Sequence, residues 1–393
     1  MTTTDPFFAL TEDSDWNACI GKQGDEENYA DGYIEAAMEL AAAVIDKSLY
    51  EKRDTLVLPI LYNARHAIEL TLKLVIREFV NRGVLTEGHK ANHDIASHAS
   101  FLEEKQIPDE SFRTQLTRLR PYIDSLTQVD SDGQELRYHT NRDGKQSMDK
   151  KALANILVIY KSLDSLSTIL GELKNRAYSL CDEWKTGTRT AHCSRQDLLE
   201  IARNLPQRSE WGSPDFEEAK NRIRARYVLS NRNFTAALDK IQETRELAGI
   251  VGINSTPIHL TNEKAEFLLG KWDTLHPPRN TDALGTDFLA RVSFRELQHE
   301  RQIEQQVIND IVSELSEEEL ADAETIYRLN STRTFAEFYE ERLEVQMKLY
   351  KVRADLRQQV QDLMGKTNFR RNFLGGLRMV GCVALADGLQ PSV

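Results

Sequence analysis

The feature of this sequence that most constrains its fold is the spacing of its apolar residues, which recur at intervals of three and four along most of the chain. That spacing puts apolar side chains on one stripe of an α-helix, and the stripe must be buried against another surface. Alternating apolar and polar residues, the mark of a half-buried strand, occur only in two short and ambiguous stretches, 251–260 and 379–386. The sequence therefore predicts an all-α protein.

The first half of the chain predicts an antiparallel helical bundle. The clearest stripe runs from Ile60 to Phe79, with Asp54 as the expected N-cap and Gly83 as the expected stop. Short connections between helices of this kind favour antiparallel neighbours. The other expected helices are one that carries a stripe from Ala30 to Ile45, two shorter ones near 95–105 and 109–127, and a long one whose stripe runs from Leu153 to Trp184 after a polar segment at 128–147.

The second half predicts a further helical domain with long helices. A continuous apolar stripe over 335–363, ending at Gly365, predicts a helix about 45 Å long at about 1.5 Å per residue. In a capping box, a Ser or Thr and a Glu three residues later satisfy the free amides of a helix start. Three such pairs are present: Ser293 with Glu296, Ser316 with Glu319, and Thr334 with Glu337.

A boundary between the two halves is expected at 185–194 (KTGTRTAHCS), which has few apolar residues and contains a glycine. The first 31 residues carry eight acidic side chains and one basic one. The expected organisation is an acidic N-terminal arm at 1–28, a helical bundle at 29–185, and a helical domain of unassigned type at 195–393.

Composition limits the classes of function. The 50 basic and 62 acidic residues among 393 give a net charge of -12, which excludes a generally basic nucleic-acid coat. The four cysteines form no Cys-x-x-Cys pair and suit reduced thiols. No apolar run approaches the roughly 20 residues of a membrane helix, and the first 15 residues lack the basic flank of a signal peptide. We therefore expect a cytoplasmic protein with no membrane partner.

Common catalytic and cofactor motifs are absent from the sequence. It contains no Gly-x-Ser-x-Gly, no P-loop, no dinucleotide fingerprint and no His-Glu-x-x-His, so no cofactor is predicted. His89, His93 and His98 cluster near Asp94, and a helical turn could present His98 and Asp94 to a metal. Imidazoles near a helix start more often cap or pack, so no metal site is predicted either.

Two polar segments in the first half are candidate sites. The second helix carries Asn63, Arg65, His66, Glu69, Lys73 and Arg77 opposite its apolar stripe, either as a solvated ion-pair ladder or as the wall of a groove. The segment 130–141 (DSDGQELRYHTN) lacks the Gly and the final Glu of a calcium loop. It is either a polar connector or a substrate-facing loop with Arg137 as an anion anchor. We expect the stretches around Tyr62 and Tyr138 to meet at one polar cleft.

Two basic segments occur in the second half. The first contains Lys220, Arg222, Arg224, Arg226 and Arg232, and its spacing favours an ordinary amphipathic surface. The second contains Lys366, Arg370, Arg371 and Arg378, interleaved with Phe369 and Phe373. Those phenylalanines either stack on bases, as nucleic-acid contact requires, or belong to the core with the arginines extending past them.

Three segments of the first half together carry a resemblance to a known family. They are 58–73 (LPILYNARHAIELTLK), the His93-Asp94-Ile95 triplet, and 130–138 with its Arg137-Tyr138 end. Over about 29–185 the chain resembles the HEPN superfamily of helical proteins. The resemblance implies a helical bundle and, in many members, a metal-independent ribonuclease that acts as a dimer; other members are binding or scaffolding domains. The family's catalytic motif is an Arg followed, after four to six residues, by a His. Here only Arg82 and His89 have that spacing, with Gly83 in place of the usual polar residue.

These observations give three functional hypotheses. The first is an RNA- or nucleotide-interacting component of a prokaryotic defence or toxin-like system. Its expected binding residues are Arg65, His66, Arg137 and Arg142, with added charge from Arg370 and Arg371. The second is a protein-interaction scaffold with a non-catalytic HEPN-like domain, which would bind a protein partner or form a homodimer. The third is a metal-independent HEPN-type ribonuclease with His89 or His139 as general acid or base.

Overall fold

A computed structural model of the chain describes residues 5, 7–10, 14–140, 144–148, 151–277, 294–352 and 355–390. Within these ranges the chain forms sixteen α-helices and several 3-10 turns, and the only β pairing is an isolated bridge between Thr140 and Gln146. The all-α prediction is therefore confirmed. The chain divides into two compact units, Met1–Trp184 and Lys185–Val393, and the division falls at the start of the 185–194 stretch.

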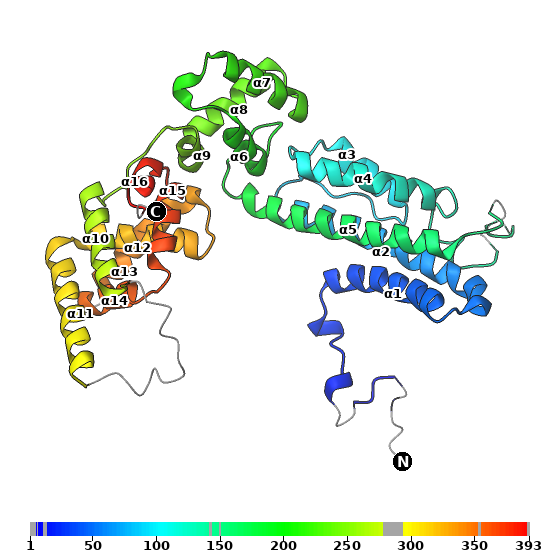
Figure 1. Cartoon of the computed structure of the whole chain (residues 1–393). Helices are drawn as coiled ribbons and strands as arrows, with labels where there is room; N and C mark the ends of the chain where they lie inside the picture. The colour runs from blue at the N-terminus through cyan, green and yellow to red at the C-terminus, as the bar shows by residue number, and fades with distance from the viewer. Residues whose placement is uncertain are drawn as a thin grey trace. The chain divides into compact units, whose positions relative to one another are not determined.

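The first unit is a bundle of five helices that lie side by side, with α1 and α2 in closest association (Figure 1). Helix α5 packs against α1, α2 and α4, while the shorter α3 covers α2 and α4. These contacts place α2 in the middle of the bundle. The helices are α1 (Glu26–Asp46), α2 (Arg53–Asn81), α3 (Ile95–Glu104), α4 (Glu110–Thr127) and α5 (Ile156–Trp184).

Aspartate side chains start three of these helices. Asp25, Asp94 and Asp109 accept hydrogen bonds from backbone amides in the first turns of α1, α3 and α4, which would otherwise lack partners. The expected N-cap of α2 is wrong: the helix begins at Arg53 without a side-chain cap, so Asp54 lies inside its first turn. The last helix begins later than expected, because Leu153 precedes α5 and is 95% exposed.

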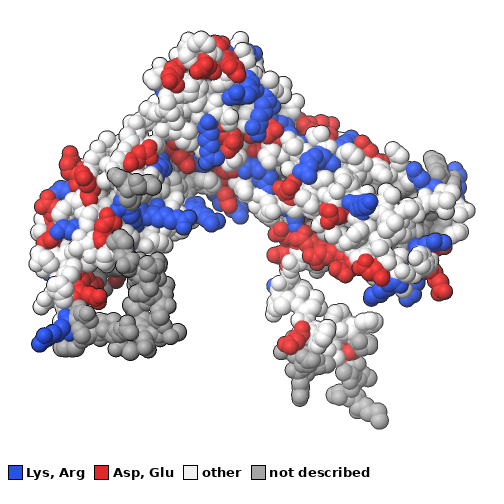
Figure 2. Space-filling view, viewed as in Figure 1, with Lys and Arg blue, Asp and Glu red and all other residues white. Residues whose placement is uncertain are grey.

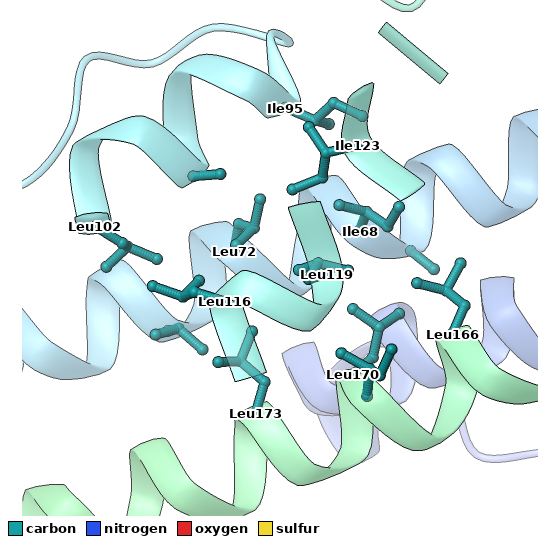
Figure 3. Packing of buried hydrophobic residues seen from close by; sticks show 14 of the residues in the cluster. Ile68, Leu72, Ile95, Leu102, Leu116, Leu119, Ile123, Leu166, Leu170 and Leu173 are labelled. Carbon is teal, nitrogen blue, oxygen red and sulfur yellow. The ribbon is translucent and has the colours of Figure 1, made fainter. Parts of the chain in front are cut away.

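The core of the first unit is the set of apolar stripes that the sequence predicts. Ile68 and Leu72 on α2 are fully buried, as are Leu119 and Ile123 on α4. Figure 3 shows leucines and isoleucines of α2, α3, α4 and α5 pointing toward one another between the helices. Burial of each such side chain contributes roughly 1.5–3 kcal/mol. This packing holds α2 rigidly, and α2 carries the polar residues of the candidate site.

The second unit contains eleven helices in its described residues and has two separate apolar cores. One core is built from residues between Cys193 and Val251, and the other from residues between Leu260 and Ala386. The helices are α6 (Arg195–Asn204), α7 (Pro214–Tyr227), α8 (Asn231–Glu243), α9 (Arg245–Ile250), α10 (Asn262–Leu275), α11 (Phe294–Glu314), α12 (Glu317–Ser331), α13 (Tyr339–Val352), α14 (Leu356–Met364), α15 (Phe369–Met379) and α16 (Val383–Gly388).

Of the expected capping boxes, Ser316 with Glu319 is confirmed at the start of α12. Thr334 with Glu337 is wrong, because the Glu337 carboxylate accepts a 2.7 Å hydrogen bond from Arg195 Nε instead. Ser293 lies outside the described residues. Ser194 and Asp197 form a further capping box at the start of α6, with Asp in the place that Glu takes in the expected pairs.

The continuous helix expected over 335–363 is also wrong. A 3-10 turn at Ala336–Phe338 precedes α13, which ends at Val352, and α14 begins separately at Leu356. The side chain of Asp355 accepts a hydrogen bond from Gln358 N and so caps α14. An apolar stripe does not reveal such a break, because both helices bury their stripes in the same core.

Charges of both signs are interspersed on the visible face of each unit, and acidic side chains gather over the first turns of α1 (Figure 2). No helix among the described residues is both long enough and apolar enough to cross a bilayer.

Candidate functional site

The candidate site lies where three segments of the first unit meet: the N-terminal half of α2, the residues just before α3, and the segment 130–138 after α4. Arg65 on α2 joins all three, because its guanidinium contacts Asp130, Ser131 and the backbone of His93. The guanidinium of Arg137 lies 5.5 Å from the ring centre of Tyr62. The stretches around Tyr62 and Tyr138 therefore lie together, as predicted, and the polar cleft expected between them stays a prediction.

Arg65 forms the buried base of the site and is only 1% exposed. Its Nε donates to the carbonyl oxygen of Asp130 at 3.0 Å, and its Nη1 donates to Glu69 Oε2 at 3.2 Å. Its Nη2 donates to the carbonyl oxygens of His93 at 2.6 Å and Ser131 at 3.3 Å. These bonds use four of the five N–H groups of a guanidinium. Arg65 therefore fixes the two loops on α2, and it does not face solvent as a ligand contact.

Asp130 holds the loop that follows α4 in a tight turn. Its Oδ1 accepts hydrogen bonds from the amides of Gln134 at 2.8 Å and Glu135 at 3.1 Å. Its carboxylate also lies 3.7 Å from Arg65 Nε. Gly133 adopts a φ of +78°, and a Cβ there would stand 3.0 Å from Arg65 Nη1. The loop conformation thus needs both a residue that tolerates a left-handed backbone and the absence of a side chain.

Glu69 is the buried counter-ion of the cluster. Lys73 Nζ donates to its Oε1 at 2.7 Å, and His93 Nδ1 lies 2.9 Å from the same oxygen. Burial acts to raise the pKa of Glu69, but the hydrogen bonds and charges of Lys73 and His93 outweigh burial and lower it. The ion-pair ladder predicted along α2 is present. It is not solvated, as one of the two alternatives required, because Arg65 and Glu69 are both buried.

The exposed layer of the site consists of Arg137 and Tyr138, and the half-buried ring of Tyr62 lies beside them. The guanidinium carbon of Arg137 lies 5.5 Å from the ring centre of Tyr62 and 5.4 Å from that of Tyr138, within the range of cation–π attraction. Arg137 Nε donates to the carbonyl oxygen of Gly133 at 2.6 Å. No ion pair to Arg137 is found among the described residues. The remaining N–H groups of this exposed guanidinium can therefore bind an anion.

His66 lies between the two layers. Its ring stacks on Tyr62 at 5.6 Å and meets the edge of Tyr33 at 4.4 Å. Burial lowers the pKa of His66, the cations Lys73, Arg65 and Arg137 lower it further, and Glu69 opposes the change. Burial therefore favours the neutral imidazole, which can both donate and accept one hydrogen bond.

Together these groups make a small recognition surface on a rigid base. It offers an exposed guanidinium, two tyrosine rings and a neutral imidazole within one patch. A guanidinium binds phosphate through paired N–H donors, and aromatic faces stack on bases. The arrangement suits a ligand that carries both a phosphate and a planar ring.

The other site residues predicted in this unit lie away from this cluster or outside the described residues. Arg142 is not among the described residues. His89 stacks on Phe101 and lies within hydrogen-bond distance of Ser97, so the structure gives it packing contacts. His139 is exposed, and its Nδ1 lies 3.4 Å from its neighbour Thr140. Arg82 is exposed at the far end of α2.

Asp94 is occupied as the N-cap of α3, and His98 is buried with its Nε2 near the carbonyl oxygen of Asn92. In the part of the chain that the structure describes, no three His, Cys, Asp or Glu side chains are grouped to hold a metal ion.

The basic residues of the second unit are mostly engaged locally. Phe369 and Phe373 are fully buried, so they belong to the core and cannot stack on bases. Arg370 donates to Asp273 Oδ2 and to the carbonyl oxygen of Leu389, both at 2.6 Å, whereas Arg371 is exposed. On α7, Lys220 pairs with Glu217, and Arg224 donates to the carbonyl oxygen of Leu229.

Two members of the cluster were missed from the sequence, Tyr33 and Gly133. Tyr33 belongs to the apolar stripe of the first helix, and only packing reveals its edge on His66. Gly133 lies within the polar segment 130–141. The Asp-x-x-Gly pattern at 130–133 is typical of a turn and could have indicated its left-handed backbone.

Comparison with known proteins finds no matching family model, no matching curated protein and no matching solved structure. The resemblance to the HEPN superfamily therefore stays a prediction from the sequence.

Proposed function

We propose that the first unit binds single-stranded RNA or a nucleotide at the patch formed by Tyr62, His66, Arg137 and Tyr138. The observation that carries the proposal is the exposed guanidinium of Arg137, which lies over two tyrosine rings and has no ion pair among the described residues. An internal structural role would normally pair that charge with a carboxylate, as Arg65 is paired with Glu69 at the base of the same site.

Tyr62 supports the Arg137 guanidinium through its ring, and the other groups have distinct parts in the proposed binding. Arg137 neutralises a phosphate, and Tyr138, which is 54% exposed, stacks on a base. His66 contributes a neutral donor and acceptor at the partly buried edge of the patch. Arg65 keeps the loop that carries Arg137 and Tyr138 in place. With this assignment the chain would serve as an RNA-interacting component of a prokaryotic defence or toxin-like system.

Fluorescence anisotropy with a labelled single-stranded RNA oligonucleotide tests this proposal on the full chain. The wild-type protein is expected to bind with an affinity that falls as salt rises. Arg137→Gln should weaken binding about tenfold and reduce the salt slope by about 0.7, the value of one phosphate contact on a single strand. Tyr138→Ala should weaken binding by roughly 1–3 kcal/mol with the salt slope kept.

The matched control is Lys161→Gln, which removes one positive charge from an exposed position on α5 outside the patch. It should leave affinity close to that of the wild type. Absence of binding at low ionic strength, or an equal loss in Lys161→Gln and Arg137→Gln, would contradict the proposal.

A protein-interaction role is a second candidate because the first unit also has an apolar groove. A cavity of about 1050 Å³ lies between the end of α1, the start of α2 and the residues before α5. Leu153 and Leu157 line it and are 95% and 56% exposed. Exposed apolar surface of this kind marks a contact site for another protein.

Light scattering after size-exclusion chromatography distinguishes this candidate from the first. A Leu153→Asp, Leu157→Asp double variant should dissociate an oligomer or release a co-purified protein if the groove is a contact site, and it should leave RNA binding unchanged. A wild-type chain that elutes as a bare monomer would argue against the groove as a self-association surface.

The ribonuclease alternative has a direct test of its own. If the chain is a ribonuclease, incubation with RNA and a chelator should give cleavage. Cleavage should be lost in Arg82→Ala and His89→Ala if His89 is the general acid or base, and in His139→Ala if His139 is. Intact RNA after incubation would remove this alternative and leave the binding proposal in place.

A further inference from the structure

A second cavity, in the other unit of the chain, has the chemistry of a small-anion site. It has a volume of about 360 Å³ and lies between α12 and α13, which are joined by the residues 332–338. Among the described residues, no carboxylate lines it. Its polar lining comprises Arg328 and Thr325 from α12, Thr332 and Thr334 from the connection, and Arg342 and Gln346 from α13.

The two arginines of this cavity differ in their partners. Arg328 is neutralised by Glu324, whose Oε1 lies 2.6 Å from Arg328 Nη2. Arg342 is exposed, and no ion pair to it is found among the described residues. The positions three and four residues away from it in the chain are Phe338, Tyr339, Val345 and Gln346, none of which is acidic. The cavity therefore has a net positive charge at its rim.

The amide of Gln346 supplies a second, independent observation. Gln346 lines the cavity one helical turn from Arg342, and its side chain is 6% exposed. Its Nε2 is buried without a hydrogen-bond partner among the described residues. Buried amides are almost always bonded, and a half-turn of the side chain exchanges its nitrogen and oxygen. A ligand in the cavity can supply the missing partner once the side chain turns this nitrogen toward it, because the atom has almost no accessible surface in its present position.

The threonines determine what else the ligand carries. Thr325 Oγ1 donates to the carbonyl oxygen of Ala321, and Thr332 Oγ1 donates to that of Arg328. Thr334 Oγ1 lies 2.8 Å from Thr332 Oγ1, and it must be the donor because the Thr332 hydrogen is already used. With these hydrogens used, the hydroxyl oxygens can form further hydrogen bonds only as acceptors.

From this arrangement we infer that the cavity between α12 and α13 binds a small organic oxyanion that also carries hydroxyl groups. Arg342 pairs with the phosphate or carboxylate of the ligand, the amide of Gln346 bonds to it, and the threonine oxygens accept from its hydroxyls. The inference does not depend on RNA binding by the first unit, because every group that it uses belongs to the second unit.

Isothermal titration calorimetry of the full chain at constant ionic strength tests this inference. Glycerol 3-phosphate and glycerate serve as the hydroxyl-bearing probes, and methyl phosphate and acetate as the matched probes without free hydroxyls. We expect one of the first two to saturate at millimolar concentration and to bind more tightly than its matched probe. Which of the two it is identifies the anionic group.

Three variants locate the binding. Arg342→Gln should weaken it at least tenfold, and Gln346→Met should also weaken it while the fold is kept, because a buried amide without a partner is replaced by an apolar chain of similar size. Arg357→Gln removes an exposed charge from α14 and should bind as the wild type does. Arg137→Gln should also bind as the wild type does, which separates this site from the patch on the first unit.

Two results would overturn the inference. One is a wild-type chain that binds neither hydroxyl-bearing probe. The other is an Arg342→Gln variant whose affinity for the bound probe equals that of Arg357→Gln.

Discussion

The buried base and the exposed layer of the candidate site each contain an arginine, and the two arginines have opposite roles. Arg65 is 1% exposed and spends its donors on a carboxylate and three backbone carbonyls. Arg137 is exposed and, within the described ranges, makes one such bond, to Gly133. A guanidinium whose N–H groups are saturated by the protein stabilises structure, and one that retains free N–H groups can bind a ligand. The two arginines thus divide positioning and recognition between them.

The largest expected effect would come from breaking the buried base. Arg65→Met leaves Glu69 and Asp130 buried without their common cation, which should cost about 3–5 kcal/mol of unfolding free energy. Arg137→Met, the matched change in the exposed layer, should stay within about 0.5 kcal/mol. Urea denaturation monitored by hydrogen-exchange mass spectrometry measures the unfolding of residues 53–184 separately from that of the second unit. Equal losses in the two variants would invalidate the comparison.

Gly133 tests how tightly the base holds the loop. Gly133→Ala should cost roughly 1–2 kcal/mol for the left-handed backbone, plus a steric cost because the new Cβ would stand 3.0 Å from Arg65 Nη1. Gly144→Ala is the control: its φ is +74°, but among the described residues nothing lies within 4 Å of a Cβ placed there. The same denaturation measurement should find Gly133→Ala the more destabilising. If Gly144→Ala costs as much, Arg65 does not restrict the loop.

A milder substitution, Arg137→Lys, tests the exposed layer more finely. The expected result rests on the proposed function. Arg137→Lys keeps the positive charge but loses the planar donors that lie over the tyrosine rings. RNA affinity should fall about fivefold, roughly 1 kcal/mol of cation–π and bidentate contact, while the salt slope stays at its wild-type value. Anisotropy titrations at several salt concentrations measure both quantities. A slope reduced as in Arg137→Gln would mean that the shorter ammonium side chain no longer reaches the phosphate.

The smallest effect expected concerns pH. Burial lowers the pKa of His66 and of His98 below the ordinary value of 6.5, so in mild acid the unfolded chain takes up protons that the folded chain resists. The free energy of unfolding should therefore fall as pH drops from about 6.5 through the lower folded pKa values. Urea midpoints on either side of about pH 6.5 measure this change. His66→Gln should show a smaller fall than the wild type, and an equal fall would contradict a role for His66.

Apolar periodicity predicted much of the first unit because helix formation and burial of a stripe depend on residues three and four apart. The helices α3 and α4 begin and end within one or two residues of the expected positions. The same local reasoning failed at Glu337, whose carboxylate pairs with Arg195 from 142 positions away. It also failed over 335–363, where two helices share one core. Partners distant in the chain leave no periodic signal.

The sequence by itself determined the helical class, the approximate helices of the bundle and the polar residues that a site could use, since these follow from side-chain chemistry and short-range spacing. Only the tertiary structure decided that Arg65 is buried while Arg137 is exposed, and that Phe369 and Phe373 belong to the core. Burial depends on which segments, far apart in the chain, cover a side chain. An arginine on the polar face of a helix therefore becomes structural or available to a ligand according to the loop that packs over it.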